Sequence, residues 1–443
     1  MIDAITVSTP ELGDRSYVVH DGSVGVAVDP QRDVDRLLEA ATAAGVRIVC
    51  VAETHLHNDY VSGGWALAHR LGVPYLVAAA EDVAFDRRPV GDGDLIELGR
   101  HFSLRVLATP GHTVHHLSYL ALDRGRPALA CTGGSLLYGS VGRTDLAGPD
   151  WTDLLAGQQF RSAHRLGQLP GWVDVLPTHG FGSFCSVSPA IVSTSTIEQE
   201  RRTNLAFRVG DESRFVSTLV AQFTDVPRYY HRMAGRNRLG ARAPDLTPPP
   251  ALDGCQVARM VDDGAWVVDL RGRGAFAAGH LAGSINVELD TPFTTYLGWL
   301  LPDDTPVVLL AETAKAIATA QVDLARIGID SVAGQLVGPL PPPVDGRATG
   351  RYPVRGFADL TRAAGQANVA LDVRRLDEWR AGHLDRAVHV PLHELGAHLD
   401  RLPPGTLWVH CAAGYRAAIA ASLLARSGRE VVLVDGRFDP PPG

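Results

Sequence analysis

The sequence LWVHCAAGYR, from Leu407 to Arg416, joins a short apolar run to an Ala- and Leu-rich stretch that begins at Ala417. The apolar run is typical of a buried strand, and the stretch after it is typical of a helix. A related pattern, VLLAETAKA at residues 308–316, lies upstream and precedes the same kind of stretch. The pattern of strand, loop and helix therefore occurs twice in the chain, with different residues in the two loops.

The two patterns belong to a tandem repeat. Cys411 aligns with Ala311 and Arg416 aligns with Ala316, at a spacing of one hundred residues. Two further matches, at an offset of 103, pair VDLR 268–271 with LDVR 371–374 and GHL 279–281 with GHL 382–384. Repeated self-similarity of this kind indicates a duplicated domain. The second copy has kept its cysteine and arginine, and the first copy has lost both.

The position of Cys411 favours a nucleophile. A thiol that follows a buried strand and precedes a helix has its thiolate stabilised by loop amides and by the helix dipole. Arg416 adds a fixed positive charge that can bind anionic substrate atoms. The alternative is that Cys411 is a small buried hydrophobic residue, as most free cysteines are. The coincidence of Gly414, Arg416 and the strand-loop-helix context favours the first interpretation.

The spacing C-x4-R makes a ring of amides sized for one sulfur atom, whereas the phosphatase loop C-x5-R is one residue longer. With the D-x-R and G-H-L elements before it, this loop resembles the rhodanese family of sulfurtransferases. The resemblance implies that Cys411 cycles between thiolate and persulfide. It also implies that the outer sulfur is cradled by the amides of Ala412, Ala413, Gly414, Tyr415 and Arg416. Because Arg416 is the only charged residue of the loop, we expect a low-molecular-weight thiol persulfide as partner, or thiosulfate handled weakly.

Composition restricts the other possibilities. At 443 residues the chain has room for about three domains, and its net charge of −8 argues against nucleic-acid or anionic-membrane partners. Five scattered cysteines suggest no disulfide framework and favour a reducing compartment. No signal-peptide pattern or membrane-spanning run is recognisable, so we expect a cytoplasmic protein. A homo-oligomer is compatible with the sequence.

Two Pro- and Gly-rich stretches, 243–250 and 337–350, are too rich in these residues for a helix or a central strand. They predict domains at 1–245, 252–337 and 351–440. The two later domains alternate short apolar strands with amphipathic helices, which is typical of α/β domains with parallel sheets.

The first domain carries a second group of functional residues. The apolar run 48–52 predicts a buried strand, and T-H-L-H-N-D-Y follows at 54–60. Later strand ends carry P-G-H-T at 110–113, T-G-G at 132–134 and P-T-H-G at 177–180. Such turns can converge on one edge of a sheet. Imidazoles gathered there suit a transition metal, and the candidate ligands are His55, His57, His112, His179 and Asp59.

This order of motifs resembles the metallo-β-lactamase superfamily, and with G-R-T-D at 142–145 it is most similar to the persulfide dioxygenase branch, allied to glyoxalase II. The resemblance implies an αββα sandwich, a substrate-binding role for Arg143, and one non-haem iron that oxidises a thiol persulfide to sulfite. The whole chain resembles fusions of such a domain with an inactive and an active rhodanese domain.

Two positions depart from the family pattern. Tyr60 stands where the pattern H-x-H-x-D-H has its last histidine, and Gly134 stands where an aspartate holds the metal. The family's iron uses residues matching His55 and His112 together with that aspartate. Without it, the three imidazoles of His55, His57 and His112 better suit Zn(II) than Fe(II). His179 and Asp59 remain as further ligands or as partners that orient the ligands.

Three functions are compatible with these residues. The first is an enzyme of sulfide and persulfide metabolism, in which an altered metal site oxidises a persulfide and Cys411 transfers sulfur. The second is a sulfurtransferase whose first two domains are scaffolds. The third is a persulfide carrier or sensor with little turnover. A two-metal hydrolase is disfavoured, because both Gly134 and Tyr60 replace ligands that it would need.

Overall fold

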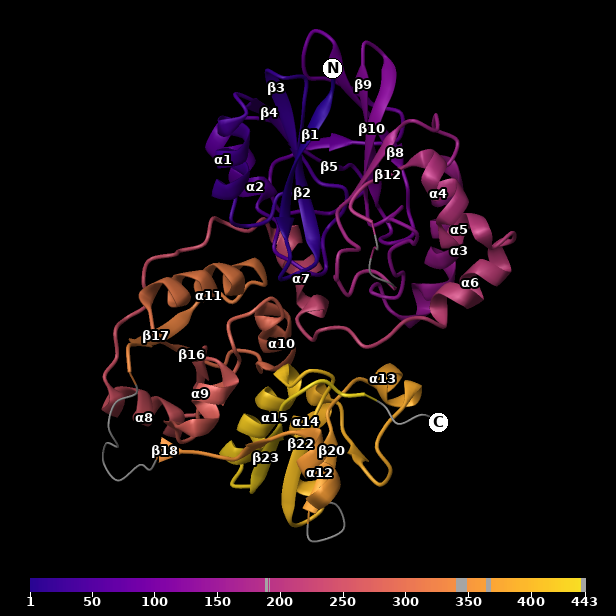
Figure 1. Cartoon of the computed structure of the whole chain (residues 1–443). Helices are drawn as coiled ribbons and strands as arrows, with labels where there is room; N and C mark the ends of the chain where they lie inside the picture. The colour runs from indigo at the N-terminus through magenta and orange to yellow at the C-terminus, as the bar shows by residue number, and fades with distance from the viewer. Residues whose placement is uncertain (188–189, 191, 340–348, 364–367, 440–443) are drawn as a thin grey trace. The chain divides into compact units, whose positions relative to one another are not determined.

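The computed structural model describes residues 1–187, 190, 192–339, 349–363 and 368–439 (Figure 1). Most of the linker predicted at 337–350 lies outside these residues. The described chain forms two compact units. The first comprises residues 1–245 and 322–329, and the second comprises residues 246–321 and 330–443. Each unit is described by itself.

The first unit contains two six-stranded sheets. One sheet has the strand order β1-β2-β3-β4-β5-β6, and the other has the order β12-β11-β10-β9-β8-β7. The strands of the first sheet are β1 (Asp3–Thr9), β2 (Asp14–His20), β3 (Val24–Val28), β4 (Arg47–Ala52), β5 (Tyr75–Ala78) and β6 (Arg88–Val90). Those of the second are β7 (Leu95–Glu97), β8 (Phe102–Ala108), β9 (Leu117–Asp123), β10 (Arg126–Gly133), β11 (Asp174–Pro177) and β12 (Ser195–Thr196).

Helices cover the outer face of each sheet, and a hydrophobic core fills the space between the sheets. That core is built from both sheets and includes Tyr17, Phe102 and Tyr119. The helices α1 (Asp35–Ala43) and α2 (Gly64–Leu71) pack on the first sheet, and α3 (Thr152–Leu166) and α6 (Glu212–Val220) pack on the second. The remaining helices are α4 (Ile197–Thr203), α5 (Leu205–Arg208) and α7 (Tyr230–Leu239). This is an αββα sandwich, as expected from the sequence.

The second unit contains both repeats, apart from residues 322–329 of the first repeat, and each repeat has its own parallel sheet. The first repeat has the strand order β15-β13-β16-β17, and the second has the order β19-β23-β22-β20-β21. The first repeat consists of α8 (Gly254–Asp262), β13 (Trp266–Asp269), α9 (Arg273–Ala278), β14 (His280–Leu281), β15 (Ile285–Asn286), α10 (Phe293–Leu300), β16 (Val307–Ala311), α11 (Ala314–Arg326) and β17 (Val332–Val337). The short β18 (Thr349–Gly350) pairs with β14.

The second repeat has the same plan. It consists of β19 (Val354–Arg355), α12 (Phe357–Ala363), β20 (Asn368–Asp372), α13 (Leu376–Ala381), β21 (Val388–His389), α14 (Leu395–His398), β22 (Thr406–His410), α15 (Tyr415–Arg426) and β23 (Val431–Val434). The strands β16 and β22 are the aligned apolar runs, and the helices α11 and α15 are the aligned Ala-rich stretches. The expected α/β domains with parallel sheets are therefore confirmed.

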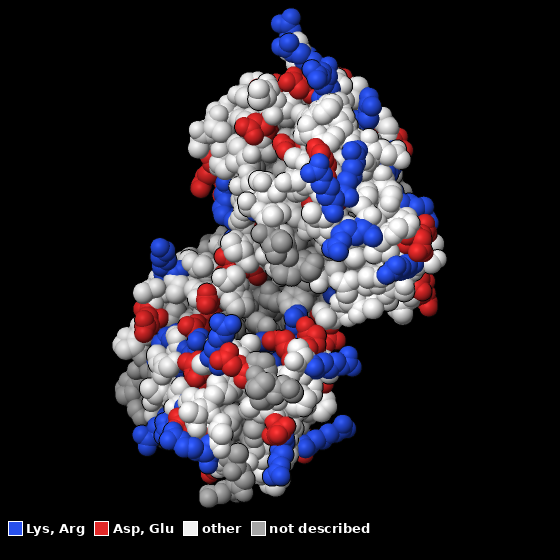
Figure 2. All heavy atoms as spheres, turned by 45° about the vertical axis from the view of Figure 1, so that its right-hand side comes forward, with Lys and Arg blue, Asp and Glu red and all other residues white. Residues whose placement is uncertain are grey.

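The surface carries charges of both signs. Acidic and basic side chains are both spread over the face drawn in Figure 2. Among the described residues, none of the helices combines the length and the apolar character that crossing a bilayer would require.

Candidate functional site

The loop that carries Cys411 lies at the carboxyl end of a central strand. The strand β22 ends at His410, and α15 begins at Tyr415. Cys411 is buried, and the backbone N–H of Ala417 donates a hydrogen bond to its sulfur at 3.4 Å. The sulfur of Cys411 therefore lies at the amino end of α15, within reach of the backbone N–H groups of its first turn. The role expected for the amides of residues 412–416 concerns an outer sulfur and stays a prediction.

Gly414 is required by the shape of this loop. Its φ of 86° lies in the left-handed region, and a Cβ at this position would overlap the carboxylate of Asp435. That carboxylate accepts a hydrogen bond from Arg273 Nε at 3.0 Å. Of the other loop residues, Ala412 is half-buried and Ala413 is exposed. The close approach of Asp435 explains why the loop needs glycine here.

Arg416 is held by a carboxylate that sequence analysis did not identify. Both of its terminal nitrogens donate to Glu378 of α13, and the Nη2 to Oε1 distance is 2.7 Å. Burial acts to raise the pKa of Glu378, but the hydrogen bonds and charge of Arg416 outweigh it and lower that pKa. The loop therefore presents a bidentate ion pair rather than an isolated positive charge.

The first repeat contributes to the surroundings of this loop, although it lacks the cysteine. The hydroxyl of Tyr415 donates to the carbonyl of Glu288 at 2.8 Å. The ring of Tyr296, on α10, lies 5.9 Å from that of Tyr415. Arg273 bridges the repeats, because it donates to Glu288 as well as to Asp435. Residues of the copy that lacks the cysteine therefore support the loop that carries Cys411.

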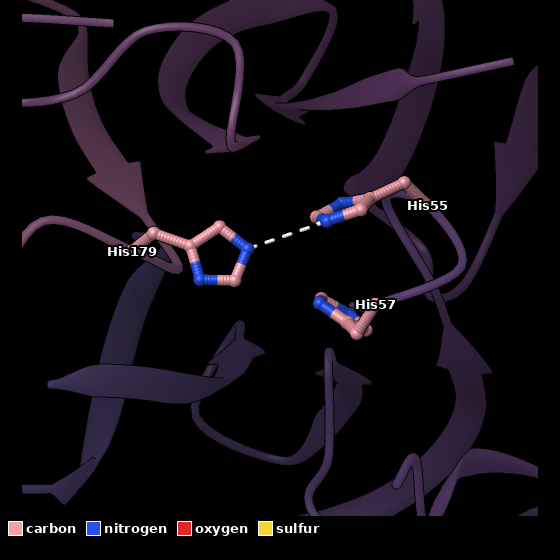
Figure 3. Close-up of side chains that lie close together, drawn as sticks. All are labelled: His55, His57 and His179. Atoms are coloured by element: carbon pink, nitrogen blue, oxygen red, sulfur yellow. Dashed lines mark hydrogen bonds between the residues drawn. The ribbon is translucent and has the colours of Figure 1, made fainter. Parts of the chain in front are cut away.

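In the first unit, the predicted histidines come together in the interior (Figure 3). The ring centroids of His55 and His57 are 4.1 Å apart, and that of His179 lies 5.3 Å from His55 and 5.5 Å from His57. His112 lies 4.8 Å from His55 and 5.3 Å from His179. All four are buried. The turns after β4, β8 and β11 therefore converge, but they do not share one edge of a single sheet, because β4 belongs to the first sheet and β8 and β11 belong to the second.

His57 is held by oxygen atoms on the side of its Nε2. Glu53 lies 3.0 Å away, Asp29 lies 3.4 Å away, and the Tyr60 hydroxyl lies 2.9 Å away. Burial acts to lower the pKa of His57, but Asp29 and Glu53 raise it to about 9. Tyr60 thus occupies the position of the missing histidine and supports His57. Its hydroxyl also donates to the carbonyl of Asp29 at 3.2 Å.

His179 is paired with two buried carboxylates. Its Nδ1 lies 2.9 Å from Asp14 and 3.0 Å from Asp59. Despite burial, Asp59 and Asp14 raise the pKa of His179 well above its usual value. Burial raises the pKa of Asp14 to about 7, and Asp59 adds to that shift. Asp59 therefore lies beside His179, where it orients the ring.

The ring of His112 occupies the space next to Gly134. A Cβ at Gly134 would lie 2.5 Å from Cγ and 2.7 Å from Nε2 of His112, and closer still to Cδ2. On the other side, a Cβ at Gly142 would lie 2.6 Å from Nδ1 of the same ring. The ring is fixed by its Nδ1, which lies 2.8 Å from the Arg143 carbonyl oxygen. The imidazole of His112 therefore occupies the space that any side chain at residue 134 would need.

Several buried nitrogen atoms of this cluster are free to bind a metal ion. The Nδ1 of His57 and the Nε2 of His112 have no hydrogen-bond partner, although buried polar atoms usually have one. The Nε2 of His55 lies 3.3 Å from the Nε2 of His179. Among the described residues, four sets of ligand atoms lie within 4.8 Å of one another. Two consist of histidines with at most one cysteine, namely His55 with His57 and His179, and His112 with His179 and Cys185, and the other two contain carboxylates. The donor set fits a metal held by imidazoles.

Some residues of the cluster were not identified from sequence. His116 accepts a hydrogen bond from the backbone N–H of Gly134 at 3.0 Å, and Cys185 is a buried thiol near His112 and His179. The pair His115-His116 after P-G-H-T was the available signal for the first. Arg143 is buried, and its guanidinium donates to Asp145 at 2.7 Å. Its substrate-binding role stays a prediction.

Comparison with known proteins finds a family model that matches both repeats and curated relatives that are similar to another part of the chain. A family model described as rhodanese-like domain matches residues 255–334 and 357–439. The persulfide dioxygenase ETHE1, mitochondrial, of Bos taurus is 30% identical over 200 residues, which cover 44% of this chain and 68% of that protein. The hydroxyacylglutathione hydrolase of Acidiphilium cryptum is 37% identical over 137 residues. Those residues cover 30% of this chain and 54% of the hydrolase.

A solved structure covers most of the chain. The metallo-beta-lactamase from Staphylococcus aureus subsp. aureus COL has a TM-score of 0.67 and 28% sequence identity. The match covers 76% of this chain and 99% of that chain. The likeness therefore extends beyond the first unit.

Proposed function

The chain belongs to the persulfide dioxygenase family of the metallo-β-lactamase fold and carries two rhodanese-like domains, and on this premise we propose that it transfers sulfur through a persulfide on Cys411. The observation that carries the proposal is the placement of Cys411, buried at a strand end and hydrogen-bonded to the first turn of α15. The matching position of the other repeat holds Ala311. The chemistry is therefore assigned to one copy alone.

The reaction needs no external oxidant. The Cys411 thiolate attacks the outer sulfur of a thiol persulfide, so that a new S–S bond forms on Cys411 while the donor's S–S bond breaks. The donor leaves as a thiolate and takes up a proton from water. A nucleophilic acceptor then removes the outer sulfur and restores the Cys411 thiolate. Sulfite is one such acceptor and yields thiosulfate.

The electrostatics of the loop favour a donor of low charge. Glu378 neutralises Arg416 through two hydrogen bonds. A thiosulfate dianion would have to compete with this carboxylate for the guanidinium, whereas a persulfide monoanion can use the loop amides alone. We therefore propose a low-molecular-weight thiol persulfide as the preferred donor and thiosulfate as a poorer one.

A specific observation supports a second activity in the first unit. His55, His57 and His179, whose ligand atoms lie within 4.8 Å of one another, would hold one metal ion, and the unpartnered Nε2 of His112 belongs to an adjoining set with His179. Bound there, Zn(II) supplies Lewis acidity, and Fe(II) also supplies oxygen chemistry. Tyr60 orients His57, and the carbonyl of Arg143 orients His112. We propose that this unit binds a metal through imidazoles and that persulfides are oxidised at this metal.

The sulfurtransferase assignment is tested by Cys411→Ser, assayed with a thiol persulfide and with thiosulfate as donors. Sulfur transfer should be lost while the unfolding transition is retained. Cys255→Ser is the matched control, because Cys255 is half-buried on α8 of the repeat that lacks the reactive loop. If Cys411→Ser kept most of the activity, the assignment of this loop would be wrong.

The metal proposal is tested by elemental analysis of protein purified without chelators, alongside oxygen uptake with a thiol persulfide. About one equivalent of iron with oxygen uptake would support the dioxygenase activity. Zinc without oxygen uptake would support a three-imidazole site that is not an oxygenase. Absence of metal, together with a stable persulfide on Cys411 and negligible turnover, would favour the carrier function.

A further inference from the structure

A pocket of about 490 Å³ in the second unit has no role in the proposed function. It lies at the carboxyl end of α15, whereas the Cys411 loop lies at the amino end of the same helix. A helix of 12 residues is about 18 Å long, so the pocket is separate from the reactive sulfur. Its volume is within the range of small-molecule sites.

The pocket lining is strongly basic. Arg351, Arg426 and Arg429 contribute to it, and Glu430 is the only carboxylate among the lining residues that the structure describes. Glu430 accepts a hydrogen bond from Thr406 at 3.1 Å. Within the described part of the chain, none of these arginines forms an ion pair, although Nη2 of Arg429 donates to the carbonyl oxygen of Pro403. Three guanidinium groups facing one carboxylate leave an excess of two positive charges.

Two polar atoms that belong to lining residues are buried without a partner. They are Nη1 of Arg426 and the hydroxyl of Tyr352, whose side chain is 7% exposed. The other terminal nitrogen of Arg426 makes only a long contact of 3.4 Å to the Ala265 carbonyl oxygen. Burial lowers the pKa of Arg426, and no neighbouring anion opposes that effect. Buried donors without acceptors are uncommon, and a bound anion would satisfy both.

We propose that this pocket binds a divalent oxyanion of the sulfate, thiosulfate or phosphate type, with Arg426 and Arg429 as the charged donors and Tyr352 as a neutral donor. The excess of two positive charges matches a dianion, and guanidinium groups bind tetrahedral oxyanions through paired hydrogen bonds. Since α15 connects the pocket to the Cys411 loop, an anion bound at one end of the helix is positioned to influence the other end.

The test is calorimetric titration of the full-length protein with sodium sulfate, against sodium chloride at equal ionic strength. Sulfate carries no transferable sulfur, so binding is measured apart from the reaction. Saturable binding is expected in the wild type. It should weaken roughly tenfold or more in Arg426→Gln and in Arg429→Gln, because each loses charge-assisted hydrogen bonds. Arg401→Gln, an exposed position outside the pocket, should bind like the wild type.

Tyr352→Phe separates binding from folding. It removes only a hydroxyl that has no partner, so the melting temperature without sulfate should stay the same or rise. Sulfate affinity should fall about threefold, as for loss of one neutral hydrogen bond. Parallel titrations with thiosulfate and phosphate identify which oxyanion is preferred.

Two results would overturn the proposal. One is the absence of saturable sulfate binding by the wild type. The other is binding that survives in Arg426→Gln and Arg429→Gln but disappears in Arg416→Ala, since that would locate the anion at the Cys411 loop. Cys411 activity is measured separately, so failure of this proposal and failure of the sulfurtransferase assignment are distinguishable.

Discussion

Substitution at Gly134 is the most informative perturbation of the metal site. Gly134→Asp restores the carboxylate that the family pattern places there, and Gly134→Ala adds the same Cβ without it. In both variants the new Cβ would lie 2.5 Å from Cγ of His112, well inside van der Waals contact. The imidazole must therefore move. We expect both variants to lose about 1–3 kcal/mol of stability in the absence of metal, as overpacked cores do.

The two variants should differ in their affinity for iron. If the shifted imidazole still binds metal, Gly134→Asp adds an anionic oxygen ligand that Gly134→Ala cannot supply. Changes in the residues that merely orient ligands alter metal affinity about 10–100-fold, so a direct ligand should change it at least as much. Anaerobic competition titration against an Fe(II) chelator measures this ratio. Urea unfolding of the metal-free variants measures the stability cost.

Equal iron affinity of the two variants would refute the reasoning that one missing carboxylate limits this site. In that case the packing of His112 between Gly134 and Gly142 would itself prevent a facial triad. Undiminished stability of Gly134→Ala would refute the position of the His112 ring. Oxygen uptake by Gly134→Asp with a thiol persulfide would extend the result from binding to activity.

Further predictions concern the ion pairs of both sites. Glu378→Gln should free Arg416 and lower the KM for thiosulfate; an unchanged KM would argue against competition between carboxylate and donor. Because Arg416 lowers the pKa of Glu378 against the effect of burial, this pair stabilises the fold above the unfolded pKa of about 4.3, and that contribution is lost as pH falls through the lower folded value. Urea midpoints between pH 7 and pH 3 should therefore fall more steeply in the wild type than in Glu378→Gln. Arg416→Ala should raise the KM for anionic donors while changing the unfolding midpoint little. If the rate depended on donor concentration in the same way in the variant and in the wild type, Arg416 would have no electrostatic role. His179→Ala should cost about 3–5 kcal/mol in urea unfolding because it leaves Asp14 and Asp59 buried without their imidazole, and a cost below 1 kcal/mol would contradict that pairing.

The architecture could be predicted from the sequence because it depends on local patterns of apolar and polar residues. Apolar runs before His55, His112 and Cys411 predicted strands, and the polar turns directly after them predicted functional loops at the strand ends. The expectation that the histidine turns share one edge of a single sheet was wrong, because they come from both sheets of the first unit. The alignment of Ala311 with Cys411 predicted two similar domains, and the structure has the same strand and helix at both positions. The family comparison confirms the fusion of the two kinds of domain.

The partners of the functional residues were not accessible, because they come from distant parts of the chain. Glu378 lies 38 residues before Arg416, and Asp14 lies 165 residues before His179. Gly134 predicted a lost ligand, but only packing shows that the His112 ring fills the space. Tyr60 looked like a loss as well, yet its hydroxyl supports His57. Pairings of this kind depend on three-dimensional proximity that no spacing rule records.

The contacts between the repeats bear on how a silent duplicate survives. A copy that has lost its nucleophile is free to drift or be deleted unless other residues depend on it. Here Arg273 holds Asp435 against Gly414, and the Glu288 carboxylate holds Arg273. The backbone carbonyl of Glu288 also accepts a hydrogen bond from the hydroxyl of Tyr415. Selection for sulfur chemistry on the second copy therefore also constrains the first. The first repeat is therefore retained because it holds the Cys411 loop in place. Its sequence is expected to diverge slowest at Arg273 and Glu288.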